Sequence, residues 1–426
     1  MTDHSVVVIG AGLGGLETAR LLAAEDVPVT VFEATPDVGG RVRTDQVDGF
    51  TVDRGFQVLF TAYPEARRAL DYEALDLRRF PPGAVVCRPN HRSIVADPFR
   101  DPRHAVETAL STEITWGDKF ELLRLRRALR DRTREEIYEG PDETIAAYLR
   151  ARGFSETFIE VFAAPFYGGI TLDRTLETSS RVFQFTFRML SEGAAAVPAE
   201  GMGAIPRQLA RRAREQGAEI ETETAVESID GEGPVEIELA DRTVTAEAVV
   251  VAAGPQESRR LTDVESIPTQ GRGVHTQFFR VPAGNPLAER KQIHLNAAAP
   301  VPNQVVSLSA VAPSYAPEGQ ALLAASTDAQ AAPDPGVLAE RTRETMAAWY
   351  PEAAFDALEL VETVSVPFAQ YAQPPGVHET LPDVTSPAGQ VFLAGDITSD
   401  SSINGALRSG RLAATAVQTA GLQMGP

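Results

Sequence analysis

Cysteine and long apolar runs are scarce in this sequence, and each shortage argues against a class of protein. Cys87 is the only cysteine among 426 residues, so neither a disulfide within the chain nor a cysteine-rich metal site is expected. No run of about 18 apolar residues occurs, which argues against a spanning helix but leaves attachment to a membrane surface open. The first residues lack the basic segment of a secretory signal, so we expect a cytoplasmic protein.

Basic residues are outnumbered by acidic ones. The chain has 39 Lys and Arg against 59 Asp and Glu, which gives a net charge of -20. Because the phosphates of a polynucleotide would meet a repelling field, no nucleic-acid partner is expected. The short motifs of zinc proteases, serine hydrolases and phosphate-loop enzymes do not occur either, and no metal site is predicted.

The N-terminal region, in contrast, contains the pattern of a βαβ unit. An apolar, β-branched run at residues 6–9 is followed by apolar residues at helical spacing over 13–24 and by a second apolar run at 27–32. Continuous apolar strands are typical of a parallel sheet that is covered on both faces. We therefore predict an α/β, Rossmann-like fold that begins at this unit.

A glycine-rich turn connects the first strand to the helix. It fits G-x-G-x-x-G, the pattern that holds the pyrophosphate of a dinucleotide at a helix N-terminus. Gly10 permits the tight turn, Gly12 lets the backbone approach the pyrophosphate, and Gly15 allows close packing of the helix. The predicted cofactor contacts in this turn are Gly10, Gly12, Leu13, Gly14 and Gly15.

Glu33 ends the second strand of the unit. A carboxylate at this place accepts hydrogen bonds from ribose hydroxyls. It would repel a ribose 2′-phosphate at short range, so the pattern favours FAD or NAD over NADP. The choice between these two depends on the residues that follow.

The stretch 33–44 reads E-A-T-P-D-V-G-G-R-V-R-T. It resembles the G-G-R segment of the large flavoprotein group that contains monoamine oxidases, protoporphyrinogen oxidases and phytoene desaturases. By this resemblance the cofactor is FAD, Ala34 belongs to its binding site, Gly39 and Gly40 give the backbone room beside the flavin, and Arg41 lies near the pyrophosphate. A guanidinium offers parallel donors to phosphate oxygens, which agrees with that last role.

Further segments resemble the same group in the same order along the chain, at residues 49–56, 201–206, 248–255, 393–396 and 403–414. By this resemblance Asp396 accepts from a ribityl hydroxyl, and the amides near Gly405 and Ala406 face the pyrimidine edge of the isoalloxazine. A helix N-terminus there would stabilise the anionic reduced flavin. The remaining implied cofactor contacts are the backbone of Val226 at the adenine, Gly254, Gly395 and Asn404.

The FAD-binding domain is predicted to be discontinuous in sequence. It consists of residues 1–71, 201–265 and 387–426, which carry the segments above. The two insertions, 72–200 and 266–386, differ in texture and have prolines at their edges, so both are assigned to a mixed sheet-and-helix substrate domain.

The two insertions are predicted to contain different secondary-structure elements. The second is expected to be a sheet, with strands at 275–281 and 304–311, and one helix at 335–350. The first is expected to be helical and aromatic, with phenylalanines that serve either as core or as walls for an apolar substrate. Its helix at 116–134 is amphipathic and carries seven basic residues, so it either faces solvent or docks on an anionic bilayer.

The substrate half lacks residues that the amine oxidases of this group use. By the resemblance, the strand at 273–280 corresponds to one that bears a lysine near flavin N5, but it has none, and 400–404 lacks the expected aromatic side chains. His275 is the one candidate catalytic residue in that strand, although a lone histidine is more often structural.

These features predict an FAD-dependent dehydrogenase, desaturase or oxidase. It would take a hydride equivalent from a hydrophobic, isoprenoid- or porphyrinogen-like small molecule to flavin N5. A flavin amine oxidase is the alternative among redox enzymes. A non-redox flavoprotein, such as a mutase, hydratase or isomerase, is the alternative of another class, and a non-catalytic FAD-binding protein also stays open.

Overall fold

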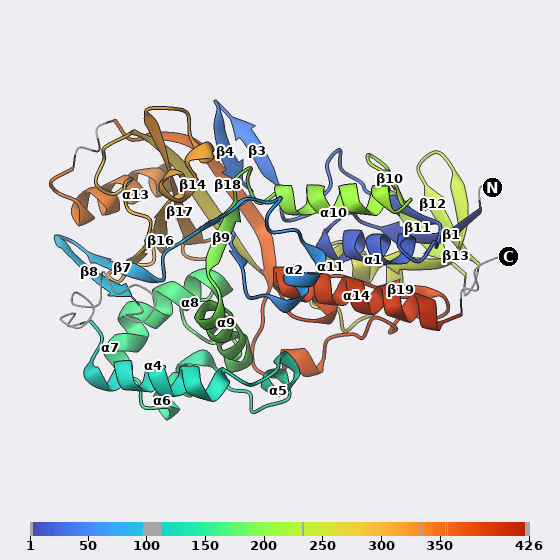
Figure 1. Cartoon of the computed structure of the whole chain (residues 1–426), viewed down its shortest axis with the longest axis horizontal. Coiled ribbons are helices and arrows are strands. Elements are labelled where there is room, and N and C mark those ends of the chain that lie inside the picture. The colour runs from blue at the N-terminus through green and yellow to red at the C-terminus, as the bar shows by residue number, and fades with distance from the viewer. Residues whose placement is uncertain are drawn as a thin grey trace.

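The computed structural model of the chain describes residues 3–96, 113–231, 234–332, 334–353, 355 and 357–421. It is a mixed α/β fold with several sheets. Figure 1 shows an elongated molecule, with β1 and the end of α14 at one extremity and a second sheet and a group of helices at the other.

Parallel strands form the centre of the first sheet, which we call the N-terminal sheet. Their spatial order is β10 (Glu219–Glu221), β2 (Val29–Phe32), β1 (Asp3–Ile9), β13 (Thr243–Val251) and β19 (Val391–Leu393). The antiparallel strands β12 (Val235–Leu239) and β11 (Val226–Asp230) extend the sheet from the first half of β13. These strands come from three separated stretches of the chain, which meet around β1.

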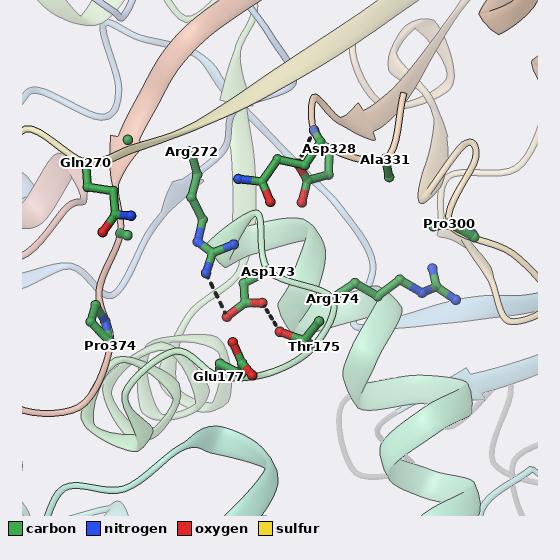
Figure 2. A pocket seen from close by; sticks show the side chains of 13 residues that line it. Asp173, Arg174, Thr175, Glu177, Gln270, Arg272, Pro300, Asp328, Ala331 and Pro374 are labelled. Atoms are coloured by element: carbon green, nitrogen blue, oxygen red, sulfur yellow. Dashed lines mark hydrogen bonds and ion pairs between the residues drawn. The ribbon is translucent and has the colours of Figure 1, made fainter. Parts of the chain in front are cut away.

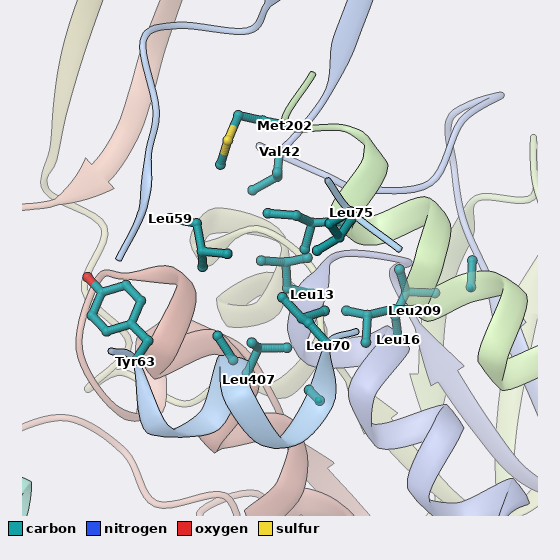
Figure 3. Packing of buried hydrophobic residues seen from close by; sticks show 14 of the residues in the cluster. Leu13, Leu16, Val42, Leu59, Tyr63, Leu70, Leu75, Met202, Leu209 and Leu407 are labelled. Atoms are coloured by element: carbon teal, nitrogen blue, oxygen red, sulfur yellow. The ribbon is translucent and has the colours of Figure 1, made fainter. Parts of the chain in front are cut away.

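Both faces of the N-terminal sheet are buried. Val6 and Val8 of β1 belong to a core shared with α1 (Leu13–Ala23), whereas Val7 and Ile9 pack on the opposite face beside α11 (Pro255–Thr262). This double cover explains why β1 reads as a continuous apolar run. On the first face α1 lies between α10 (Ala204–Glu215) and α14 (Ile403–Thr419). Figure 3 shows the leucines at this junction: Leu13, Leu16, Leu209 and Leu407.

The second sheet has the order β18, β14, β17, β16, β15, β7, β8. Its strands are β18 (Glu359–Tyr371), β14 (Gly271–Pro282), β17 (Gln320–Asp328), β16 (Gln304–Ser307), β15 (Ile293–Asn296), β7 (Gly83–Arg88) and β8 (His91–Ala96). On one face Phe279 packs against Met346 and Trp349 of α13 (Pro335–Trp349). On the other, Phe278 and Leu322 join the core that reaches α1.

Two expectations about the insertions are wrong in detail. The first insertion is not only helical, because its strand β7 forms a parallel ladder with β15 of the second insertion. The expected strand at 304–311 ends at Ser307, and the next residues form the helical turn α12 (Leu308–Val311). The sheet is therefore built from both insertions.

The helices of the first insertion pack into a core of their own. They are α4 (Trp116–Leu129), α5 (Arg134–Tyr138), α6 (Ile145–Ala151), α7 (Glu156–Phe158), the π-helix η2 (Ile159–Ala163), α8 (Ala164–Thr171) and α9 (Ser180–Glu192). The rings of Phe154, Phe158, Phe162 and Phe166 stack in series, with centroid separations of 4.7, 5.5 and 5.4 Å. Phe154 and Phe158 are buried in this core, which favours the packing role for this row.

Short elements complete the fold. They are the hairpin of β3 (Thr44–Val47) and β4 (Phe50–Asp53), the small sheet of β5 (Leu59–Phe60), β9 (Ala195–Pro198) and β6 (Leu77–Arg79), the helix α2 (Pro64–Ala69), and the single turns η3 (Pro313–Tyr315), η4 (Val377–Glu379) and η5 (Asp396–Thr398).

The helix predicted at 116–134 is interrupted, because α4 ends at Leu129 and a new helix, α5, begins at Arg134.

Candidate functional site

The glycine-rich turn joins β1 to α1 and leaves space at the N-terminus of that helix. A methyl group at Gly15 would lie 2.1 Å from the carbonyl oxygen of Gly10, so Gly15 is needed for packing. A methyl group at Gly12 would meet nothing within 4 Å, and the same holds at Gly254, where α11 begins. Since the first amides of a helix have no partner within the helix, this space suits a phosphate.

Glu33 lies beside the turn with its carboxylate buried. Its Oε2 accepts from the amide of Ala11 at 2.8 Å, and its Oε1 accepts from the amide and the hydroxyl of Thr35 at 2.9 and 2.7 Å. The amide of Thr224 donates to the carbonyl of Glu33 at 2.9 Å, which brings the segment before Val226 to the same edge. Ala34 is exposed there. Ala34 and the segment that leads to Val226 thus lie beside Glu33.

Arg41 links the G-G-R segment to the C-terminal motif. Gly39 and Gly40 precede it with φ angles of 122° and 57°, which favour glycine. The Nη2 of Arg41 donates to Oδ1 of Asp396 at 2.6 Å, and its Nη1 donates to the carbonyl of Ala369 at 3.1 Å. Two residues that lie far apart in the sequence therefore form one charged pair.

The N-terminus of α14 closes the site from the other side. Ser402 caps the helix by accepting from the amide of Gly405 at 2.9 Å. Asn404 is fully buried, and its Nδ2 has no hydrogen-bond partner, although its Oδ1 accepts from the backbone amide of Glu65 at 3.1 Å. Because a buried amide group without a partner is costly, this donor indicates a missing acceptor. A methyl group at Gly14 would lie 2.8 Å from the amide nitrogen of Gly395, so the two motifs touch.

A buried charged cluster beside this helix was not anticipated from the sequence. Arg134 donates to Oδ1 of Asp400 from Nε at 3.0 Å and from Nη2 at 2.5 Å, and its guanidinium lies 4.2 Å from the ring centre of Tyr138. Burial alone would raise the pKa of Asp400, but Arg134 and Ser402 hold it below its usual value. The expectation that Arg134 belongs to the basic face of one long helix is wrong. The T-x-x-E signal at Thr133, which starts a new helix, could have predicted the break.

Aromatic side chains do surround the loop at 399–402, although that loop has none of its own. The hydroxyl of Tyr371 donates to the carbonyl of Ser399 at 3.3 Å. Tyr63, the residue before α2, lies near Asp400 and Ser402. Its burial and the negative charge of Asp400 both raise the pKa of Tyr63. His378 packs edge to face on Tyr138, and burial lowers its pKa to about 4. The chain supplies these rings from distant elements.

His275 is not brought to this site. Its Nδ1 lies 2.7 Å from Oγ of Ser365, and Gln277, on the same face of β14, accepts from Thr342 of α13. Thr276 points the opposite way and accepts from the amide of Phe56 at 3.4 Å. Since alternate residues of a strand face opposite sides, His275 lies on the α13 side of the sheet.

Asp53, in the 49–56 segment, has a structural role. Its Oδ1 accepts from the hydroxyl of Thr44 at 2.5 Å and from the amide of Met202 at 2.8 Å, and its Oδ2 accepts from the hydroxyl of Tyr315 at 3.0 Å. Burial raises its pKa to about 6, although each of these donors opposes the shift. Asp53 thus joins β3, the segment before α10 and η3. In the described ranges no cluster of three His, Cys, Asp or Glu suggests a metal site.

The family of the chain follows from comparison with known proteins. The family model for flavin-containing amine oxidoreductases matches residues 13–418, so the chain belongs to that family. Membership confirms the predicted flavoprotein superfamily, the FAD-dependent oxidoreductase class and FAD as the cofactor.

Individual relatives are similar over shorter stretches. The chain is 29% identical to protoporphyrinogen oxidase 2 of Arabidopsis thaliana over 40% of this chain and 33% of that protein. It is 41% identical to a zeta-carotene-forming phytoene desaturase of Myxococcus xanthus over 20% of this chain and 16% of that protein. The matches thus span a third or less of the length of these two relatives. The fold is similar to that of an oxidoreductase from Methanosarcina mazei, with a TM-score of 0.74, 19% identity and coverage of 97% of this chain and 100% of the other.

Proposed function

We propose that the protein is an FAD-dependent dehydrogenase, desaturase or oxidase that takes a hydride equivalent from a hydrophobic, isoprenoid- or porphyrinogen-like small molecule to flavin N5. The observation that carries this proposal is the meeting of the turn at Gly12, the Arg41–Asp396 pair and the start of α14 at one place. The two named relatives act on a porphyrinogen and on phytoene, which supports the substrate class.

In this proposal the chain's own groups bind and orient the cofactor. Glu33 accepts from the ribose, the open amides at Gly12 and the guanidinium of Arg41 donate to the pyrophosphate, and Asp396 accepts from the ribityl chain. The unpartnered Nδ2 of Asn404 would donate to the pyrimidine edge of the bound flavin. When bound, FAD supplies the hydride acceptor, and the protein's task is placement and exclusion of water.

We assign residues 1–71, 201–265 and 387–426 to a discontinuous Rossmann-like FAD-binding domain. The N-terminal sheet, whose strands come from these three stretches, supports this division. Residues 72–200 and 266–386 form the substrate domain in this assignment. The pairing of β7 with β15 supports one domain built from both insertions.

Anaerobic reduction of the flavin tests the proposed function. We expect the visible absorbance of the purified holoenzyme to bleach with one member of a panel of isoprenoids and porphyrinogens. Bleaching and peroxide release with amines alone would favour the second candidate, amine oxidation, which the buried tyrosines around Asp400 support. Product formation without bleaching, or no turnover of any compound, would contradict the proposal.

We further propose that the protein is cytoplasmic and docks on anionic membrane surfaces through α4. Trp116, Phe120 and Leu123 are 72%, 60% and 47% exposed. They recur at i, i+4 and i+7, and the exposed Arg127 and Arg130 continue the same row. Apolar and basic side chains on one helix face complement an anionic bilayer. None of the helices in the described ranges has the length and apolarity needed to cross a bilayer.

Vesicle cosedimentation tests this surface. We expect the holoenzyme to sediment with phosphatidylserine-containing vesicles and not with phosphatidylcholine alone. The triple variant Trp116→Ser, Phe120→Ser, Leu123→Ser should lose most of that binding, because each buried apolar side chain contributes about 1.5–3 kcal/mol. The matched control is Val337→Ser with Leu360→Ser, which removes exposed apolar residues elsewhere. Equal binding of both variants would contradict docking through α4.

A further inference from the structure

A buried pair of opposite charges lies against the start of α14. A methyl group at Gly405 would lie 2.0 Å from the carbonyl oxygen of Asp400 and 2.9 Å from the carbon of its carboxylate, so Asp400 packs directly on the first turn of that helix. Arg134 donates two hydrogen bonds to Oδ1 of Asp400 and a third, at 3.0 Å, to Oγ of Ser399. Both charges are therefore held close to the helix N-terminus.

Hydrogen bonds connect this pair to the backbone of α14. The hydroxyl of Ser402 donates to Oδ2 of Asp400 at 2.5 Å and accepts from the amide of Gly405. A hydroxyl that donates to a carboxylate becomes a better acceptor for its second partner, because such bonds polarise one another. A change of charge at Asp400 therefore acts on the first turn of α14.

Neutral rings surround the pair. Tyr63, Tyr138 and Tyr371 lie near Asp400, and burial raises the pKa of each of their hydroxyls, so all three stay uncharged. Burial lowers the pKa of His378, the next ring, to about 4, so it is neutral near pH 7. Since buried charges are screened much less than exposed ones, a full charge in these surroundings acts over a longer distance than one at the surface.

Another arginine–aspartate pair is placed differently. Figure 2 shows Arg272 reaching toward Asp173 at the wall of a polar cavity of about 590 Å³, which Arg174 also lines. The Nη2 of Arg272 lies 3.4 Å from Oδ2 of Asp173. A polar cavity of this size has room for water, which screens the charges of its walls. Neither Arg134 nor Asp400 lines this cavity, so their charges act with less screening.

Two arginines balance the two carboxylates of the segment before α14. Asp396 is paired with Arg41, and Asp400 is paired with Arg134. This balance leaves two positive groups uncancelled, the N-terminal end of the helix dipole and the unpartnered Nδ2 of Asn404. Loss of one arginine would leave a net negative charge at this end of the helix.

The reduced flavin carries the charge on which this balance acts. Two-electron reduction of FAD with uptake of one proton leaves one negative charge on the pyrimidine side of the isoalloxazine. In the proposed function that edge faces the start of α14. A positive environment there stabilises the reduced form and raises the reduction potential, whereas an unpaired carboxylate would lower it. A flavin of higher potential accepts a hydride equivalent from a weaker reductant.

We propose that the Arg134–Asp400 pair sets the reduction potential of the bound flavin. Arg134 acts through Asp400 and the first turn of α14, so it is a positioning residue and does not touch the reacting atoms. This inference rests on the proposed function, which places the pyrimidine edge at that turn. The pair keeps the flavin a strong enough oxidant for a substrate whose reacting carbon is a weak reductant.

The midpoint potential of the purified holoenzyme tests the proposal. It is measured against reference dyes during anaerobic reduction, in mildly alkaline buffer where a carboxyl is ionised. Asp400→Asn leaves the charge of Arg134 unbalanced and should raise the potential, whereas Arg134→Gln leaves Asp400 unbalanced and should lower it. We expect each redox equilibrium to change about tenfold, which is about 30 mV for a two-electron couple. The double variant should return toward the wild-type potential.

Arg150→Gln is the control for net charge. It removes an exposed arginine of the same insertion, so it should leave the potential unchanged. A pair that only stabilises the fold predicts no shift, or shifts of one sign in both single variants of the pair. Either result would overturn the inference.

Arg408→Gln covers the case in which a single variant of the pair does not fold. The guanidinium of Arg408 lies near both Arg134 and Asp400, which act on its pKa in opposite directions. Its loss removes a positive charge from the same place while the pair stays intact, so the potential should fall. An unchanged potential in this variant would then overturn the inference.

The inference and the proposed function fail in different ways. If a compound of the panel bleaches the flavin but the variants keep the wild-type potential, the function stands and the inference fails. If the two single variants shift the potential in opposite directions but no compound bleaches the flavin, the inference stands and the function fails.

Discussion

Two glycines of the glycine-rich turn have different predicted roles, one in folding and one in cofactor binding. A methyl group at Gly15 collides with backbone, whereas one at Gly12 enters open space. We expect Gly15→Ala to destabilise the fold by about 1–3 kcal/mol, as overpacking does. We expect Gly12→Ala to purify with little FAD, while the melting temperature of its FAD-free form stays that of the FAD-free wild type. Thermal denaturation and flavin content measure the two effects. Full FAD content in Gly12→Ala would contradict the assignment of the phosphate to this space.

The raised pKa of Asp53 predicts that the stability of the fold depends on pH. Its pKa is raised from 3.8 to about 6, mainly by burial. Between those values the folded state binds more protons than the unfolded state, so this group's contribution to the free energy of unfolding falls as pH rises, by about 1.4 kcal/mol per pH unit. We expect Asp53→Asn to lack this loss, so that its stability relative to the wild type improves between pH 4 and pH 7. Urea unfolding across that range checks the sign, and a constant difference would contradict it.

At the scale of elements, the pair of Arg134 and Asp400 ties α5 to the loop before α14. Their side chains are 11% and 3% exposed. Removing one partner leaves a buried charge, so we expect Arg134→Gln to cost about 3–5 kcal/mol, and the double variant with Asp400→Asn to cost less than the sum of the single variants. A double-mutant cycle on urea unfolding measures the coupling. The exposed pair of Arg150 and Glu156 is the control. Strictly additive effects at Arg134 and Asp400 would contradict an energetic coupling between these two side chains.

At the scale of the whole molecule, the proposed cofactor site joins three separated stretches of the chain. A ligand that binds only the folded state stabilises it by about 2.7 kcal/mol at 100 times its dissociation constant. We therefore expect removal of FAD to lower the melting temperature and readdition of FAD to restore it. NADP should not restore it, because Glu33 would meet the 2′-phosphate. Equal melting temperatures with and without FAD would contradict a site at this junction.

Much of the N-terminal region could be predicted from the sequence. The expected run at 6–9, helix at 13–24 and run at 27–32 correspond to β1, α1 and β2 within a few residues. The helix at 335–350 is likewise confirmed as α13. The resemblance to the flavoprotein group is confirmed by the family model, whereas the roles of the individual cofactor residues stay predictions.

The features that the sequence did not predict have a common origin. β7 was not expected to pair with β15, Arg134 was not expected to reach Asp400, and the face of β14 that carries His275 was not known. Each depends on contacts between residues that lie far apart in the chain. In a strand with mixed side chains, the register and the packing partner decide which face meets the cofactor.

The sequence by itself determined the family, and it predicted the dinucleotide turn and the preference against a 2′-phosphate, because these depend on glycines, a carboxylate and motifs that act within a few neighbouring residues. Only the tertiary structure decided that Arg41 meets Asp396, that Arg134 is buried, and that Arg174 and Arg272 line one cavity. The physical reason is that burial and charge pairing arise when distant segments pack together, and local spacing does not encode those distances.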